Sequence, residues 1–164
     1  MLKPINGTWF EFHHHNIKEG KYWNTIVREF SDEQWEAKVD EIASLGMKYI
    51  VLLTSAIIYH DWSEAYFETD VLPRARMAAK DPMDALLRAA ERNDMKVFMS
   101  CGFYGTWVET ENNMVSPEVQ ARAFRAMEQL YTKYGHYKSF YGWYLPDETA
   151  IEPLTNRVQP DTDY

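Results

Sequence analysis

The sequence predicts an α/β protein in which parallel strands alternate with amphipathic helices. Three observations support this fold class. Short apolar stretches of strand length alternate with longer stretches of helical spacing, in the order β-α-β-α-β-α-β. The predicted strand starts recur about every 45 residues, the length of a βα unit that carries a loop. The linkers that follow strands are long, whereas those that follow helices are short.

The first half of the chain contains two predicted strands and one helix. Residues 7–15 are rich in aromatic side chains, which is typical of a strand. A helix follows, with Ser31 or Asp32 as the N-cap of a capping-box sequence, and it ends before Gly46. Residues 47–54 are a continuous apolar run, as expected of a strand covered on both faces. The helix carries its apolar side chains at helical spacing: Trp35, Val39, Ile42 and Leu45.

The second half repeats this order. Asp81 and Pro82 supply an N-cap and an N1 proline for the second helix, and residues 95–101 form the next buried strand. The third helix begins at Ser116, and residues 140–145 form the fourth strand. The apolar stripes of the two helices are Met83, Leu86, Leu87 and Ala90, then Val119, Ala123, Met127, Leu130 and Tyr134.

Composition limits the classes of partner. The 164 residues fit a single β/α domain over 1–164, in which 151–164 form an irregular tail. The net charge of -8 argues against nucleic-acid and anionic-membrane partners, which need clustered Lys and Arg. No signal peptide or membrane-length apolar run is visible. Cys101 is the single cysteine, so no intrachain disulfide forms. No glycine-rich phosphate loop is present, and we expect no cofactor.

Aromatic residues make up 15% of the sequence and gather at strand ends and in the loops that follow strands. In β/α folds these loops form the ligand-binding face. Trp62 and Trp107 in the loops, and Trp143 near the end of the fourth strand, are therefore expected to bind sugar rings, whose flat apolar faces suit aromatic walls. Core packing is the alternative for part of this set.

Asp147 and Glu148 follow the fourth strand directly. In a β/α barrel this position opens on the substrate. A glutamate desolvated there by aromatic walls has its pKa raised towards that of a general acid. The alternative is a surface turn in which Asp147 caps a helix and Glu148 is solvated.

Strand alternation places Glu11, His13 and His15 on one face. These residue types are acceptable zinc ligands, but successive members lie about 7 Å apart, too far for tight binding of one ion. We therefore expect no metal site. Glu11 and the histidines near the strand's end are instead expected to bind sugar, with solvated or core-packed histidines as the alternative.

Four segments together resemble a known family: residues 7–12, 45–48, 95–98 and 139–148. Over residues 5–150 the sequence resembles the bacterial TIM-barrel family catalogued as domain of unknown function 4434. Members of that family are treated as glycoside hydrolases, and they are similar in layout to the clan A retaining glycosidases.

The resemblance implies a parallel (β/α) barrel of TIM type, of which this chain holds about four βα units, the N-terminal half. It places the acid/base glutamate at Glu148 and a substrate contact at Asp147, where clan A enzymes usually have asparagine. The nucleophile would lie on a seventh strand, whereas retaining hydrolysis needs two carboxyl groups about 5 Å apart. The resemblance also implies a periplasmic or secreted location.

Three functions therefore stay open. The chain is a glycosidase completed by a missing C-terminal half, a non-catalytic carbohydrate-binding domain, or a self-associating β/α domain with no sugar role. Half a barrel leaves edge strands and the inner face of its sheet uncovered, so we expect either the missing half or a homodimer to cover them.

Overall fold

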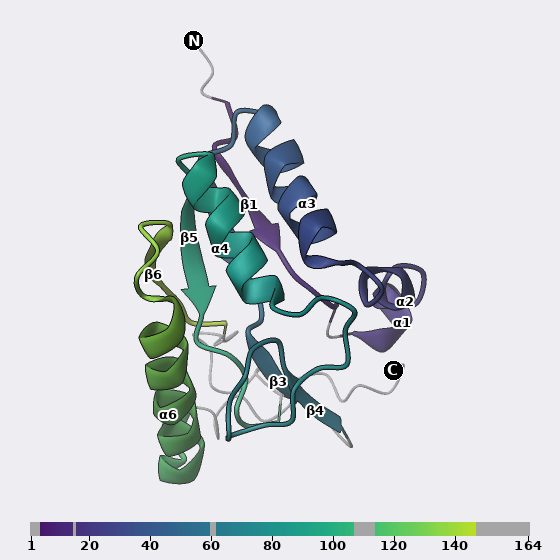
Figure 1. The fold of residues 1–164 in the computed structure, drawn as a ribbon. Coiled ribbons are helices and arrows are strands. Elements are labelled where there is room, and N and C mark those ends of the chain that lie inside the picture. The colour runs from purple at the N-terminus through teal and green to yellow at the C-terminus, as the bar shows by residue number, and fades with distance from the viewer. Residues whose placement is uncertain (1–3, 15, 60–61, 107–113, 147–164) are drawn as a thin grey trace.

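The structure is a computed structural model that describes residues 4–14, 16–59, 62–106 and 114–146. Its centre is a four-stranded sheet in the order β1-β2-β5-β6, in which all neighbouring strands are parallel (Figure 1). This confirms the predicted α/β class, and each strand lies inside the stretch predicted for it. The strands are β1 Gly7–Phe10, β2 Tyr49–Leu52, β5 Lys96–Ser100 and β6 Phe140–Tyr144.

Three long helices follow the strands as predicted. Two of them, α3 and α4, lie side by side over one face of the sheet (Figure 1). The main core forms between this helical layer and the strand side chains that point towards it, such as Ile50, Leu52 and Val97. The bounds of the helices are α3 Asp32–Ser44, α4 Pro82–Arg92 and α6 Pro117–Tyr134.

Local sequence signals fix the helix ends. The Ser31 hydroxyl accepts the backbone N–H of Gln34, and the Gln34 side chain accepts the backbone N–H of Ser31, which completes a capping box. Gly46 follows α3 with φ 84°, a left-handed conformation that glycine adopts without strain. Asp81 caps α4 and Pro82 occupies its first turn.

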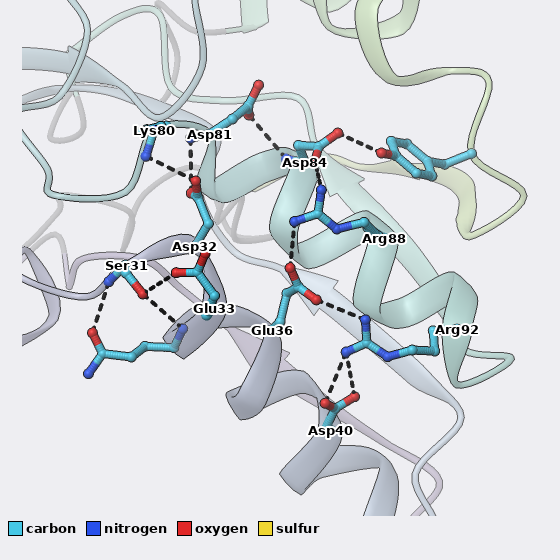
Figure 2. Close-up of polar contacts among 12 residues, drawn as sticks. Ser31, Asp32, Glu33, Glu36, Asp40, Lys80, Asp81, Asp84, Arg88 and Arg92 are labelled. Carbon is cyan, nitrogen blue, oxygen red and sulfur yellow. Dashed lines mark hydrogen bonds and ion pairs between the residues drawn. The ribbon is translucent and has the colours of Figure 1, made fainter.

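Charged side chains join α3 to α4 on the outer surface (Figure 2). Glu36 accepts hydrogen bonds from Arg88 at 2.5 Å and from Arg92 at 2.8 Å, and Asp40 accepts from Arg92 at 2.9 Å. Both arginine side chains are about half exposed, 49% and 47%. Solvent screening limits each such pair to about 0.2–1 kcal/mol, so the apolar core supplies most of the stability of this layer.

The opposite face of the sheet is concave and aromatic. Trp9 on β1 and Tyr144 on β6 have ring centroids 4.9 Å apart, although β2 and β5 separate their strands. In a flat sheet the two strands would lie about 14 Å apart, so this contact requires the sheet to curl. Exposed aromatic side chains also include Tyr49 and Tyr141.

Two features inside the post-strand loops were not predicted. The segment after β2 forms an antiparallel hairpin of β3 Ala56–Tyr59 and β4 Trp62–Ala65. The segment after β1 contains two one-turn helices, α1 Ile17–Gly20 and α2 Asn24–Val27. Both features lie beyond the carboxyl ends of the parallel strands (Figure 1) and bring loop residues together there.

The predicted tail, 151–164, lies outside the described residues. Within the part of the chain that the structure describes, no helix has the length and apolar character needed to cross a membrane.

Candidate functional site

A cavity of about 370 Å³ lies beyond the carboxyl end of β1, between the α1–α2 segment and the β3–β4 hairpin. Three different parts of the chain supply its walls, which is the usual construction of a ligand site at this end of a parallel sheet. Its lining residues are His13, Lys21, Asn24, Thr25, Arg28, Trp62 and Glu64.

Two of the predicted sugar-binding residues meet in this cavity. The rings of His13 and Trp62 lie 5.9 Å apart, nearly perpendicular at 82°. Tyr59 supports Trp62 from the same hairpin, with ring centroids 6.0 Å apart. The structure therefore brings His13 and Trp62 together in one cavity, in an edge-to-face arrangement.

A charged cluster lies beside these two rings. Arg28 Nη2 donates to Glu64 Oε1 at 2.7 Å, and the Tyr66 hydroxyl donates to the same oxygen at 3.0 Å. Arg28 Nη1 also donates to the backbone carbonyl of Arg76 at 3.2 Å. Among the described residues the hydrogen bonds to the Glu64 carboxylate all reach Oε1.

Burial controls the chemistry of Tyr66. Desolvation, followed by the neighbouring Glu64 charge, raises the pKa of Tyr66 well above its ordinary value. The hydroxyl therefore stays protonated at neutral pH and remains a hydrogen-bond donor to Glu64. Together, Arg28 and Tyr66 fix the carboxylate in one orientation.

A second polar cluster follows β1 immediately. Glu11 Oε1 lies 2.8 Å from His14 Nδ1, and His14 Nε2 lies 2.9 Å from Glu19 Oε2. Asn16 donates to the other oxygen of Glu19 at 2.9 Å. Asn24 accepts the backbone N–H of His14 and donates to its carbonyl, which holds the loop in place.

Glu11 is half-buried, and desolvation raises its pKa, an effect that the charge and hydrogen bond of His14 partly offset. Its Oε2 atom is buried and has no hydrogen-bond partner among the described residues. Among those same residues, no group of three His, Cys, Asp or Glu side chains is arranged to hold a metal ion.

A larger cavity of about 430 Å³ lies where α6 meets the ends of β5 and β6. Its walls are mostly apolar, among them Phe103, Phe124 and Leu145, and Pro146 closes one side. Cys101 contributes a thiol whose pKa burial raises to about 11. That thiol is protonated at neutral pH and is a poor nucleophile.

The remaining predicted site residues lie elsewhere. Trp143 packs on Phe140, with ring centroids 5.1 Å apart, and lines neither cavity. Glu11 lies beside His14 and does not line the cavity of His13 and Trp62. Four predicted residues fall outside the described part of the chain, and their roles stay predictions: His15, Trp107, Asp147 and Glu148.

Sequence reasoning missed several cavity residues. Lys21, Asn24 and Arg28 recur at helical spacing in the long loop after the first predicted strand, so this period was a usable signal. Glu64 lies two positions after Trp62 on the short strand β4, so strand alternation places both on one face and was also a usable signal. The hydrogen bond between Arg28 and Glu64, which are 36 positions apart, depends on where the hairpin packs, and no local sequence signal predicts it.

Comparison with known proteins agrees with this architecture. A solved structure from Bacteroides thetaiotaomicron VPI-5482, described as a putative alpha-L-fucosidase, is similar with a TM-score of 0.57 and 20% sequence identity. The match covers 87% of this chain and 40% of that one, so the chain spans less than half the length of this relative. At this level of sequence identity, the similarity is evidence for a shared fold alone.

No curated protein matches the sequence. The family model described as "Domain of unknown function (DUF4434)" matches residues 5–162. The match covers almost the whole chain. The chain therefore belongs to the DUF4434 family.

Proposed function

We propose that the chain is part of a glycoside hydrolase-like domain that binds carbohydrate beyond the carboxyl ends of its parallel strands, with Glu148 as the general acid/base. The observation that carries this proposal is the cavity that His13 and Trp62 line together with the fixed carboxylate of Glu64. Family membership and the similarity to a solved protein described as a putative alpha-L-fucosidase agree with this class.

The chemistry of the cavity suits a sugar. A pyranose ring presents an apolar face and a rim of hydroxyl groups, so it needs an aromatic surface and several hydrogen-bond partners close to it. Trp62 offers the surface. Glu64 Oε2 accepts hydroxyl donors, while Lys21 and Asn24 donate to hydroxyl oxygens. A neutral polyhydroxylated ligand uses both kinds of partner.

The four-stranded sheet is proposed to be half of a TIM barrel. The curl measured by the Trp9–Tyr144 contact gives it the concavity of a barrel wall, and exposed aromatic side chains line that concave face. Such a face is unfavourable in water. We therefore propose that further βα units, supplied by additional chain or by a second copy, cover it and complete the active-site rim.

Fluorescence titration tests carbohydrate binding. Oligosaccharides are expected to change the tryptophan emission of the wild-type chain, and Trp62→Ala is expected to abolish most of the response and of the affinity. Trp35→Phe is the matched control, because Trp35 is a core residue between Phe10 and Phe12. If no member of a broad panel of neutral oligosaccharides binds, the proposal is wrong.

Leaving-group dependence tests the role of Glu148. Glu148→Gln is expected to lower kcat/KM about 10²–10⁴-fold on glycosides with poor leaving groups, and much less on aryl glycosides whose leaving groups need no protonation. Equal losses on both substrate types, or no loss on either, would contradict general acid catalysis by Glu148.

A non-catalytic carbohydrate-binding domain is the second candidate. It is favoured because the family resemblance places the nucleophile on a seventh strand, beyond the four parallel strands described here. Saccharide binding without any release of reducing ends by the wild-type chain would select this function over hydrolysis.

A further inference from the structure

Each ring nitrogen of His14 meets a carboxylate oxygen. Nδ1 lies 2.8 Å from Oε1 of Glu11, which follows β1, and Nε2 lies 2.9 Å from Oε2 of Glu19 on α1. The His14 side chain is 16% exposed, so water competes weakly for either nitrogen. An ionised carboxylate oxygen can only accept a hydrogen bond, so each contact needs a proton on the ring nitrogen that faces it.

A neutral imidazole cannot satisfy both contacts. It carries one N–H group, and its other nitrogen would present a lone pair to an ionised oxygen at hydrogen-bond distance. The arrangement therefore holds one proton more than a neutral histidine between two carboxylates. An imidazole is ordinarily a stronger base than a glutamate carboxylate, by about two pKa units, so the ring is the favoured place for that proton.

His14 joins the end of β1 to one wall of the cavity. Its ring contacts Glu19 of α1. Its backbone contacts α2, because the N–H donates to Asn24 Oδ1 at 2.8 Å and the carbonyl accepts from Asn24 Nδ2 at 3.0 Å. The α1–α2 segment in turn supplies four of the cavity's lining residues: Lys21, Asn24, Thr25 and Arg28.

We propose that His14 is a pH-sensitive clamp on this cavity. As an imidazolium it bridges Glu11 and Glu19 and holds the α1–α2 segment against the end of β1. As a neutral imidazole it keeps one of the two contacts, and the segment loosens. The inference rests on the proposed function for the use of the cavity, and it adds regulation by pH to that same site.

The Glu19 contact is the one expected to break. The Glu19 side chain is 57% exposed, so it can turn to water, whereas Glu11 is 25% exposed. Asn16 continues to cap α1 and to donate to Glu19 Oε1 at 2.9 Å, so the segment loosens without unfolding. A wall that spends less time in place lowers the apparent affinity of the cavity in the same proportion.

The other groups of these elements leave the ring as the switch. Burial raises the pKa of Glu11, an effect that the charge and hydrogen bond of His14 partly offset. Trp23, the N-cap of α2, packs on the ring with centroids 5.8 Å apart and carries no charge. The cations of the segment are Lys18, Lys21 and Arg28, of which Arg28 pairs with Glu64.

Two NMR measurements on the wild-type chain test the clamp without any ligand. Imidazole ¹⁵N shifts are expected to show protons on both nitrogens of His14 at about pH 6, and on one nitrogen at about pH 8.5. Hydrogen exchange of the His14 backbone N–H reports whether α2 is docked, because Asn24 accepts that hydrogen bond. Its protection factor is expected to fall about 2–5-fold over the same range, the size of a partly exposed ion pair.

Glu19→Gln separates the clamp from general packing. Its amide nitrogen, in the place of Oε2, can donate to a neutral His14 Nε2, and its carbonyl oxygen still accepts from Asn16. Protection should therefore stay high and should not change with pH. His14→Gln should give low protection at both pH values.

His136→Gln is the matched control, because His136 packs on Tyr137, with ring centroids 4.3 Å apart, and does not line the cavity. It is expected to keep the pH dependence of wild type. Tryptophan fluorescence melts verify that each variant is folded.

The outcomes are distinguishable from those that test the proposed function. A His14 ring with one protonated nitrogen at about pH 6 would overturn the clamp. So would a protection factor that does not change with pH, or one that changes equally in Glu19→Gln. These measurements use no saccharide, so such a failure leaves the proposed function standing. A chain that passes them but binds no saccharide would overturn the proposed function, and with it the regulation of a sugar site.

Discussion

Replacing Glu64 by Gln probes the cavity at its charged centre. The change keeps the size of the side chain and one acceptor oxygen, so Tyr66 retains a partner, while Arg28 loses its counter-charge. The Arg28 and Glu64 side chains are 26% and 11% exposed, so the pair is partly buried. Arg28 keeps its bond to the carbonyl of Arg76. Leaving the partly buried Arg28 without this counter-charge costs about 1.5–3 kcal/mol.

Urea unfolding and thermal melts measure this cost. The expected loss corresponds to a drop in Tm of about 3–12 °C for a domain of this size. Glu68→Gln is the matched control, because Glu68 is 66% exposed and meets Arg74 at only 3.4 Å; its free energy of unfolding should change by less than about 0.5 kcal/mol. If Glu64→Gln were as stable as the control, the Arg28–Glu64–Tyr66 cluster would not exist as described.

Three further predictions concern the rest of the fold. Glu36→Ala removes the acceptor of two half-exposed arginines and should cost about 0.5–2 kcal/mol in urea unfolding; a larger loss would contradict the assignment of stability to the core. Cys101 should react slowly with a disulfide reagent at pH 8 and fast once unfolded, because burial raises its pKa to about 11; rapid native labelling would contradict this. Hydrogen bonds from Arg125 and Gln129 lower the pKa of Asp70, so their contribution is present at neutral pH and is lost as the pH falls through the folded-state pKa. Asp70→Asn should therefore make the free energy of unfolding fall less steeply with pH on the acid side. An unchanged dependence on pH would contradict this role of Asp70.

Much of the fold was predictable because short-range chemistry determines it. Ser31, Gly46 and the Asp81-Pro82 pair mark helix ends by capping and backbone conformation, which depend on a few neighbouring residues. The apolar runs between these signals have strand length, and β/α alternation leads to a parallel sheet.

The loops were harder to predict because their structure depends on packing. The run that continues from β2 into β3 is interrupted by Thr54 and Ser55 alone, a weak local signal for the break between the strand and the hairpin. The candidate site was predicted in part: His13 and Trp62 meet because the hairpin folds over the end of β1. Arg28 and Glu64 join them through a contact between distant segments that no sequence period encodes.

The crystal structure of this chain with an oligosaccharide that it binds tests the central claim most directly. The account predicts a sugar ring against Trp62, with a ring hydroxyl within hydrogen-bond distance of Glu64 Oε2. A saccharide bound elsewhere, with the cavity of His13, Trp62 and Glu64 unoccupied, would contradict it.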